Sequence, residues 1–287
     1  MHLRGRKLLM ADSQKCDLHI HSLYSDSNES IESIFRTAKE KKLRAIAITD
    51  HDTVEGIPEA AALSVQYGVE LINGIEFSCQ HLDAEVHVLG FFIDEKHKVL
   101  RDTLDGLKES RKSRLLEMIA KLKAFGLKID QDEILAIIND KIATRLHLGF
   151  YLAKKGYAVN LNDAFKQFLA PGKPGYVARF KHTVKDAAQL IHDAGGLAFL
   201  AHPQLLPDRA WMEEFVKDGI DGIEAAYPRL SPKIKQFFFE FVQKHKVLRS
   251  GGSDAHGTYK EFTSVGAVDV PYAWVEEMKT HLSYVRR

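Results

Sequence analysis

The sequence has few cysteines and no long run of apolar residues. Cys16 and Cys79 are the only cysteines in 287 residues. Two are too few for a disulfide framework, and neither lies in a CxxC spacing typical of zinc or redox sites. Near the first residue, the apolar run "LLMA" is far shorter than a signal-peptide core or a membrane span. We therefore expect a cytoplasmic protein with no membrane partner.

The chain also lacks a charge excess and internal repeats. Its 40 Lys and Arg residues nearly balance its 39 Asp and Glu residues, for a formal net charge of +1. This balance argues against a broad basic surface for duplex DNA, so any nucleic-acid contact is expected to be local. The absence of repeats and low-complexity stretches excludes solenoid and linker architectures. A chain this long can bury a large core as one domain, or as a domain carrying an insertion.

Hydrophobic periodicity predicts alternating strands and helices over the first third of the chain. Short apolar segments typical of strands cover residues 15–21, 44–49, 69–78 and 84–92. Between the first two, apolar residues recur at the i, i+3, i+4, i+7 spacing of a helix, namely Ile31, Ile34, Phe35 and Ala38. A second helical pattern covers residues 58–68. This alternation favours an α/β sheet or barrel with helices outside.

The pattern changes at about residue 97. A long amphipathic helix is expected to end at Gly126, and further helical segments follow up to residue 170 with no strand among them. Strand and helix patterns alternate again after the loop at residues 171–177. We therefore expect three segments: the first part of a barrel at 12–96, a small all-helical insertion at 97–181, and the second part of the barrel at 182–287.

Polar side chains close the predicted strands, where a core would otherwise be expected, and only His87 lies inside its strand. They are His19 and His21 in "CDLHIHS", Asp50, His51 and Asp52 in "ITDHDT", Glu76 in "GIEFS", His87 in "EVHVLG", His202 in "LAHP", and Asp254 and His256 in "GSDAH". A single histidine of this kind is more often a satisfied residue on an exposed strand. Several together indicate one site, because neighbouring strands converge on one mouth of a β/α barrel.

Metal binding accounts for such a convergence, since uncompensated polar groups there would cost roughly several kcal/mol each. Imidazole mixed with carboxylate and no thiolate is typical of Mn²⁺, Fe²⁺ or Zn²⁺, and not of a Cys-type structural zinc or an all-oxygen Ca²⁺ site. The candidate ligands exceed what one ion can use. We therefore expect two or three ions close together, which would clamp phosphoryl oxygens and activate water near neutral pH.

Six short segments, taken in sequence order, resemble the ligand motifs of the PHP (polymerase and histidinol phosphatase) superfamily. They are "DLHIHSLYSD", "ITDHDT", "GIEFS", "EVHVLG", "LAHP" and "GSDAH", spread over nearly the whole chain. The resemblance implies a distorted (β/α)7-type PHP barrel with a small all-helical insertion as a substrate cap. It also implies catalytic roles, which fall on His19, His21, Glu76, His202, Asp254 and His256.

The same resemblance implies three groups of metal ligands. The first ion would be held by His19, His21, Glu76 and Asp254, the second by His87 and His202 with Glu76 bridging, and the third by Asp26, His51 and His256. Mn²⁺ is the expected ion, with Fe²⁺ and Zn²⁺ as alternatives. Asp17 and Asp52 match no ligand position, and hydrogen bonds that orient a ligating imidazole are an expected role for either.

Within the superfamily, three further segments resemble a bacterial group of nucleoside 3′,5′-bisphosphate phosphatases and 5′→3′ exoribonucleases. They are "ATRLHLGFYLAKKG", "DAFKQFLAPGKPGYV" and "AGGLAFLAHP". This resemblance implies that Arg145 and His147 contact substrate phosphate, with Lys173 and Tyr176 in the matching loop. An arginine fork suits a second, non-reacting phosphate. The alternative for Arg145 is an ordinary residue at the start of a helix.

We therefore predict a metal-dependent phosphoric ester hydrolase. The expected substrate is a small nucleoside bisphosphate or the 5′-phosphorylated end of a short RNA. A histidinol-phosphate phosphatase is the first alternative, although its substrate has no second phosphate for Arg145 and His147. A PHP module that binds metal without turnover is the second, but such a module should have lost ligands, and here all nine positions hold residues able to coordinate. Amide or lactone hydrolysis stays open from the ligands alone. The sequence does not fix the oligomeric state, and a monomer is compatible with it.

Overall fold

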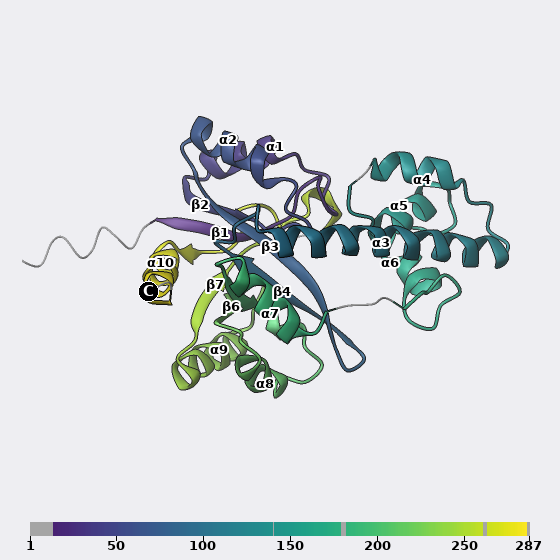
Figure 1. Cartoon of the computed structure of the whole chain (residues 1–287). Helices are drawn as coiled ribbons and strands as arrows, with labels where there is room; N and C mark the ends of the chain where they lie inside the picture. The colour runs from purple at the N-terminus through teal and green to yellow at the C-terminus, as the bar shows by residue number, and fades with distance from the viewer. Residues whose placement is uncertain (1–13, 140, 179–181, 261–262, 286–287) are drawn as a thin grey trace, which may run out of the picture.

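The computed structural model describes residues 14–139, 141–178, 182–260 and 263–285. Its main body is a nearly closed, eight-stranded barrel with helices outside, and a group of helices extends from one side (Figure 1). The α/β barrel predicted from the sequence is therefore confirmed. The apolar run at residues 8–11 and the segment boundaries expected at residues 12 and 181 lie outside the described residues.

The described strands form one sheet in the order β7-β6-β5-β4-β3-β2-β1-β8. Their bounds are β1 Lys15–Ile20, β2 Leu43–Ile48, β3 Glu70–His81, β4 Ala84–Phe91, β5 Leu197–Leu200, β6 Gly222–Ala226, β7 Leu248–Gly251 and β8 Val270–Pro271. β1, β2 and β3 run parallel, as do β5, β6 and β7, but β4 is antiparallel to both of its neighbours. β3 and β4 therefore form a hairpin within a mostly parallel barrel.

The barrel closes where the segment after β7 meets β1. The Asp254 N–H donates to the His19 carbonyl at 2.8 Å, and the His21 N–H donates to the Ala255 carbonyl at 3.0 Å. Gly252 permits this approach, because a Cβ at that position would lie 2.4 Å from the His19 backbone nitrogen. The closure brings the ends of the first and the last parallel strands to the same mouth.

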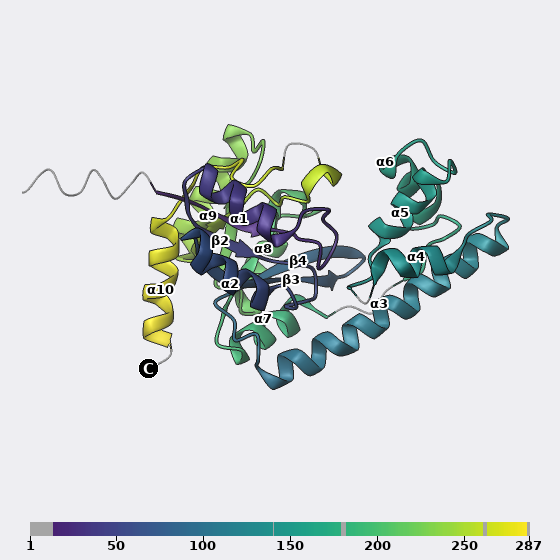
Figure 2. The ribbon, with the colours of Figure 1, turned by 90° about the horizontal axis from the view of Figure 1, so that it is seen from above.

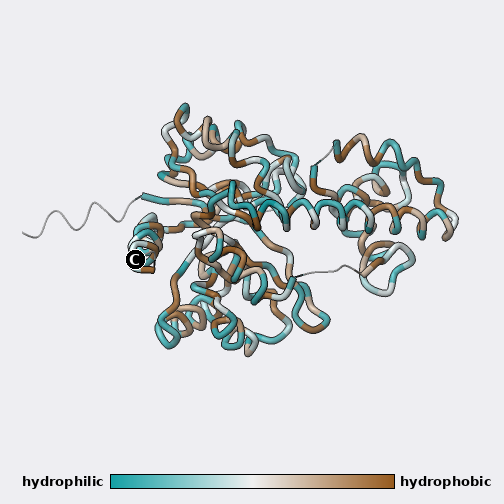
Figure 3. The backbone as a smooth tube through the Cα atoms, viewed as in Figure 1, coloured by the Kyte–Doolittle hydropathy of each residue, from teal (hydrophilic) through white to brown (hydrophobic). Residues whose placement is uncertain are grey.

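Helices cover the outside of the barrel. They are α1 Ile31–Glu40, α2 Ile57–Tyr67, α7 Val184–Asp193, α8 Trp211–Lys217, α9 Pro232–His245 and α10 Ala273–Val285, with the short turns η3 Pro203–Leu205 and η4 Gly257–Tyr259. The face that α1 buries is the one predicted, with Ile31, Ile34, Phe35 and Ala38. Hydrophobic and hydrophilic segments alternate along these helices (Figure 3). Within the described residues, no helix combines the length and the hydropathy needed to cross a membrane.

The helices that extend from the barrel are α3 Lys98–Ala124 and those that follow it. They comprise α4 Gln131–Ile138, α5 Arg145–Lys154, α6 Leu161–Ala164 and the π-helical turn η2 Phe165–Leu169. The first half of α3 packs in the barrel core through Leu100 and Leu104, whereas the second half packs in a separate hydrophobic cluster through Leu115 and Leu122. Figures 1 and 2 both show α3 leading away from the barrel. One continuous helix is thus shared by the barrel and the group of helices beside it.

Glu76 does not end a strand, which corrects the sequence-based expectation. β3 continues to His81 and turns into β4, so Glu76 lies within the hairpin opposite Leu89, and Ser78 pairs with His87. The polarity of Glu76 itself suggested a strand end. The Glu76 side chain faces the histidines predicted as ligands, and the strand continues past it.

We predict that Gly252→Ala destabilises the barrel. Its Cβ would lie 2.5 Å from the His19 Cβ and 2.9 Å from Asp17 Oδ1, and such overpacking costs about 1–3 kcal/mol. Urea unfolding followed by circular dichroism measures this loss. Gly106→Ala in α3 is the matched control, because no atom lies within 4 Å of a Cβ there. It should stabilise the protein by about 0.5–1 kcal/mol. Equal midpoints for Gly252→Ala and the wild type would contradict the prediction.

Candidate metal centre

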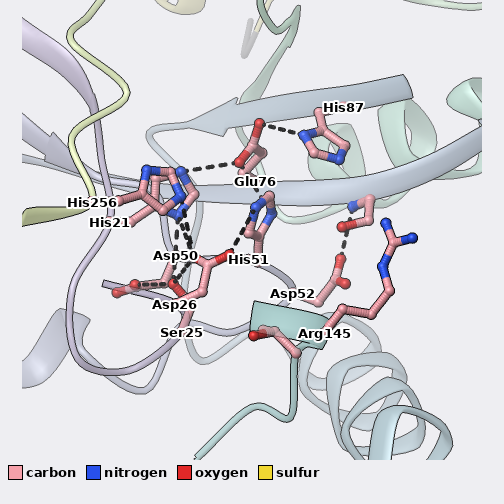
Figure 4. Close-up of polar contacts among 12 residues, drawn as sticks. His21, Ser25, Asp26, Asp50, His51, Asp52, Glu76, His87, Arg145 and His256 are labelled. Atoms are coloured by element: carbon pink, nitrogen blue, oxygen red, sulfur yellow. Dashed lines mark hydrogen bonds and ion pairs between the residues drawn. The ribbon is translucent and has the colours of Figure 1, made fainter. Parts of the chain in front are cut away.

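All nine predicted metal ligands lie at one mouth of the barrel. They are His19 in β1, His21 and Asp26 after β1, His51 after β2, Glu76 in β3, His87 in β4, His202 after β5, and Asp254 and His256 after β7. Six of these nine side chains are fully or almost fully buried, and His51, His87 and His202 are partly exposed. Figure 4 shows Glu76 between His21 and His256 on one side and His87 on the other.

The Glu76 carboxylate faces two groups of ligands through its two oxygens. Oε2 lies 3.1 Å from His21 Nε2 and 3.4 Å from His19 Nε2. Oε1 lies 3.0 Å from His87 Nδ1 and 3.2 Å from His202 Nε2. This division matches the bridging role that the resemblance implied for Glu76.

The other two carboxylates complete the groups. Asp254 Oδ1 lies 3.5 Å from His19 Nε2 and 3.4 Å from His21 Nε2, on the side of the first group. Asp26 Oδ1 lies 3.3 Å from His256 Nε2, and its Oδ2 lies 3.6 Å from His51 Nε2. Asp26 Oδ1 is also 3.4 Å from His21 Nδ1. The three expected ligand groups are therefore contiguous in space.

The donor atoms fit divalent ions. His19 Nε2 and His21 Nε2 lie only 3.2 Å apart. Two unprotonated nitrogens at this distance would repel each other, so a cation or a proton is needed between them. The buried His51 Nδ1 makes no hydrogen bond, although it is 3.1 Å from Glu76 Oε2. In each of three sets of residues, the donor atoms all lie within 4.8 Å of one another. The sets are His21, Asp26, His51 and His256; His19, His21 and Glu76; and His51, Glu76 and His87. Imidazole with carboxylate at these spacings is a metal-binding donor set.

The pKa values of the predicted ligands are shifted because imidazoles and carboxylates lie next to one another in a buried site. Burial alone would lower the pKa of His87, but the Glu76 carboxylate raises it to about 10. Burial would likewise lower the pKa of His21, but hydrogen bonds with Asp254 and Glu76 raise it to about 9. The pKa of Asp254 lies well below its usual range, because His19 and Lys260 outweigh the effect of burial. The centre thus attracts positive charge.

Several residues that the sequence did not single out support the ligands. Glu224 in β6 is fully buried, accepts a hydrogen bond from the His202 N–H at 2.7 Å, and lies 3.0 Å from His19 Nδ1. Tyr227 donates to Asp254 Oδ2 at 2.7 Å, and Lys260 pairs with the same oxygen. An acidic residue inside the apolar segment "DGIEAA" was the available signal for Glu224.

Asp17 is bound by backbone groups, and Asp52 by a backbone group and an arginine. Asp17 accepts hydrogen bonds from the backbone N–H groups of His19, Ser253 and Gly266, and so ties β1 to the segment after β7. Asp52 accepts from the Ser78 N–H at 2.9 Å and forms an ion pair with Arg111 of α3. Glu224, 3.0 Å from His19 Nδ1, is placed to orient the imidazole of a predicted ligand.

Two cavities open from the ligands. One, of about 350 Å³, is lined by ligands of all three groups and by Leu146, Leu161, Tyr259 and Lys260. The other, of about 140 Å³, is lined by Asp26 and His51 together with Arg111, Arg114 and Arg145. The Phe150 and Tyr259 rings, 3.8 Å apart, join α5 to the barrel beside the larger cavity. The centre therefore opens into space walled by α3, α5, α6 and η2 as well as by the barrel.

The four residues expected to contact phosphate lie in different places. Arg145 lines the smaller cavity and lies 3.5 Å from Glu85 Oε2. His147 caps α5, where its Nδ1 accepts from the Thr144 N–H at 3.2 Å, and burial lowers its pKa. Lys173 is exposed, and the Tyr176 carbonyl accepts a hydrogen bond from Lys121 near the far end of α3. Of the four, Arg145 has the clearest path to the centre.

Comparison with known proteins places the chain in a family. The PHP domain model matches residues 17–194. A 5′-3′ exoribonuclease of Haemophilus influenzae is 31% identical over 249 residues, covering 85% of this chain and 90% of the relative. A 3′,5′-nucleoside bisphosphate phosphatase of Chromobacterium violaceum is 32% identical over 256 residues, covering 87% and 90%.

The fold agrees with this placement. The crystal structure of a proposed metal-dependent phosphoesterase from Bifidobacterium adolescentis superposes with a TM-score of 0.85 at 26% identity, covering 93% of this chain and 96% of that one. The chain belongs to the PHP domain family. The family predicted from the sequence is thereby confirmed. The predicted enzyme class, a phosphoric ester hydrolase, is confirmed as well, since these relatives are hydrolases of phosphate esters by name.

We predict that Glu76→Gln disrupts two ligand groups at once. Both carboxylate oxygens face imidazoles, and an amide offers one weak ligand oxygen in their place. The bound Mn²⁺, measured by elemental analysis after dialysis, should fall by at least one ion per chain, and phosphatase activity should fall by on the order of a hundredfold or more. Full metal content together with full activity would show that the assignment is wrong.

Glu224→Gln tests the support of the first and second groups. The substitution keeps the size of the side chain but removes the charge beside His19 Nδ1. We predict that Mn²⁺ affinity, measured by titration of the metal-free protein, weakens about 10–100-fold. Glu277→Gln, at an exposed ion pair with Arg249, is the control and should bind Mn²⁺ as the wild type does. Equal affinities for all three proteins would exclude a supporting role for Glu224.

Proposed function

We propose that the protein is a metal-dependent phosphoesterase that hydrolyses nucleoside 3′,5′-bisphosphates such as adenosine 3′,5′-bisphosphate, and that it also removes nucleotides from the 5′-phosphorylated end of short RNA. The observation that carries the proposal is a cavity shared by ligands of the third group, Asp26 and His51, and by three arginines. A metal-type cluster beside a cavity lined by arginines, with Glu85 beside Arg145, suits a substrate with one reacting phosphate and one bound phosphate.

The nine ligands are the residues that would hold the ions. In this proposal His19, His21, Glu76 and Asp254 hold the first, His87 and His202 share Glu76 for the second, and Asp26, His51 and His256 hold the third. Mn²⁺ is the proposed ion, with Fe²⁺ or Zn²⁺ as alternatives. Divalent ions bound there supply Lewis-acid stabilisation of the phosphoryl oxygens and an activated water.

The protein itself then mainly positions the substrate. The catalytic residues we assign are His19, His21, Glu76, His202, Asp254 and His256, because they surround the place where the reacting phosphate would lie. Leu146 and Leu161 of the helical insertion and Tyr259 of the barrel wall the larger cavity. They exclude part of the solvent and hold the rest of the substrate, which is the role of the proposed substrate cap.

Arg145 is the residue we assign to the second phosphate. Its guanidinium lies 3.5 Å from Glu85, at the limit of a hydrogen bond, so a doubly charged phosphate can displace that carboxylate. Arg114 lines the same cavity while donating to the Val177 carbonyl. The first residues of α5 lie there too, and a helix N-terminus favours anions. His147, Lys173 and Tyr176 stay proposals as secondary contacts.

The names of the two relatives support this choice of substrate. One is a bisphosphate phosphatase and the other an exoribonuclease acting from the 5′ end. Both names fit a site that binds a terminal nucleotide by two phosphates. A histidinol phosphate would leave the arginine-lined cavity without a ligand.

A panel of three substrates tests the proposed function. The Mn²⁺-loaded enzyme should have a higher kcat/KM for adenosine 3′,5′-bisphosphate and for a short 5′-phosphorylated RNA than for histidinol phosphate. The advantage should be about tenfold or more, as expected from a charge-assisted contact of about 1.5–3 kcal/mol. Preference for histidinol phosphate would overturn the substrate assignment but not the metal centre.

Arg145→Gln tests the second-phosphate contact directly. We predict that KM for adenosine 3′,5′-bisphosphate rises about tenfold, whereas KM for 3′-AMP, which keeps the reacting 3′-phosphate but lacks the 5′-phosphate, changes by less than about threefold. Lys154→Gln is the control, because Lys154 lies exposed at the other end of α5 and pairs only distantly with Glu133, at 3.6 Å. An equal rise in KM for both substrates would mean that Arg145 does not bind the second phosphate.

The site also bears on assembly and location. We propose a monomer, since the predicted ligands and the three arginines lie together within a single copy of the chain. Cys16 and Cys79 are free and buried, which fits the proposed cytoplasmic location.

A further inference from the structure

The buried face of α3 carries a charged residue at the point where the helix leaves the barrel. Within α3, all of which is described, the buried residues are apolar except Arg111. Arg111 lies between Leu107, which packs in the barrel core, and Leu115, which packs in the separate cluster of the insertion. Its side chain therefore lies at the junction between the barrel and the helical insertion.

On the barrel side, the guanidinium binds residues adjacent to metal ligands. Arg111 Nε donates to Asp52 Oδ2 at 2.9 Å, and Nη2 donates to the same carboxylate and to Ser78 Oγ at 3.1 Å. Asp52 directly follows the ligand His51, and Ser78 lies two residues after Glu76 on the same strand. Arg111 thus contacts the two segments that carry His51 and Glu76.

On the insertion side, the same guanidinium binds the segment that leads into α5. Arg111 Nη1 donates to the Ala143 carbonyl at 3.3 Å. Ala143 precedes Thr144, the residue that caps α5, and Arg145 begins that helix. One planar group therefore joins the backbone beside the proposed phosphate contact to the backbone beside the metal ligands.

Asp52 links this contact to the segment that carries His51, and its own position is tightly constrained. It is fully buried, adopts a positive φ of 49°, and its N–H donates to the Glu76 carbonyl at 2.9 Å. Its other carboxylate oxygen accepts from the Ser78 N–H at 2.9 Å. Few residues other than Asn, Asp and Gly adopt this backbone conformation without strain. A shift of the Asp52 carboxylate would therefore move the peptide that carries His51.

We propose that Arg111 is a positioning residue that sets the spacing between the third ion site, formed by Asp26, His51 and His256, and Arg145. The proposal rests on the proposed function for the role of Arg145, and on the metal centre for the rest. The buried pair with Asp52 holds His51 in place from one side and the start of α5 from the other.

The chemistry of arginine explains why this residue suits the junction. Its rigid fork satisfies three acceptors in fixed directions, which the point charge of a lysine does not do. A buried ion pair adds little net stability over well-packed apolar residues. The geometric constraint on His51 and Arg145 is what distinguishes this pair from an apolar contact.

Three proteins test the proposal. Arg111→Lys keeps the charge and loses the fork. Arg111→Met combined with Asp52→Asn removes both charges of the pair and keeps a residue that tolerates positive φ, so it should fold even if Arg111→Met alone does not. Arg101→Met is the matched control, because Arg101 also joins α3 to the barrel, through an exposed ion pair with Glu55 at 3.0 Å.

The first measurement is the titration of each metal-free protein with Mn²⁺, with circular dichroism confirming the fold. In Arg111→Lys and in the double variant, the weakest-bound ion should bind about tenfold more weakly, with the other ions unchanged. Arg101→Met should match the wild type. Wild-type Mn²⁺ binding in a folded double variant, or a wild type that binds no ion at the third group, would overturn the proposal.

The second measurement separates this proposal from the proposed function. At saturating Mn²⁺, the ratio of kcat/KM for adenosine 3′,5′-bisphosphate to that for 3′-AMP should fall about tenfold in both Arg111 variants and stay unchanged in Arg101→Met. An unchanged ratio in folded Arg111 variants would overturn the link to Arg145. If the wild type itself did not prefer the bisphosphate, the proposed function would fail, and the Mn²⁺ titration, which needs no substrate, would still decide the link to the third ion.

Discussion

The whole arrangement depends on how the buried carboxylate of Glu76 is compensated. A lone charge in that position would be costly, yet both of its oxygens are approached by imidazole nitrogens from different strands of the barrel. The barrel brings these imidazoles to Glu76 because it closes between β1 and the segment after β7. His19, His21 and Asp254 meet at this closure. Closure of the sheet and assembly of the centre are therefore one structural event.

The support of the centre reaches further than its ligands. Glu224 fixes His19 and His202 from β6, Asp17 ties the two closing segments together, and Arg111 reaches Asp52 from the insertion. Each of these contacts involves a buried charged side chain, so each constrains direction as well as distance. The polar interior of this barrel is thus a network in which the ligands occupy the centre, while apolar residues pack around it.

Much of this could be predicted from the sequence, and the rest could not for physical reasons. Strand and helix alternation and the order of the His, Asp and Glu motifs are local patterns, so they indicated the barrel and the ligands. The hairpin of β3 and β4 escaped notice because a polar residue within a strand resembles a strand end. Glu224 escaped because it is a single charged residue in an apolar segment, and Arg111 because it lies among the other charged residues of "KESRKSR". Only tertiary structure shows what each of them contacts. The roles of Lys173 and Tyr176 stay predictions.

The sharing of α3 has a mechanical consequence. At 27 residues the helix is about 40 Å long, and its two halves are fixed in two separate cores. Any movement of α4 and α5 relative to the barrel would therefore have to bend or tilt α3, since this helix crosses the junction without a loop. A tilt of α3 about the position of Arg111 would displace the far end of the helix by an amount that grows with its distance from the barrel.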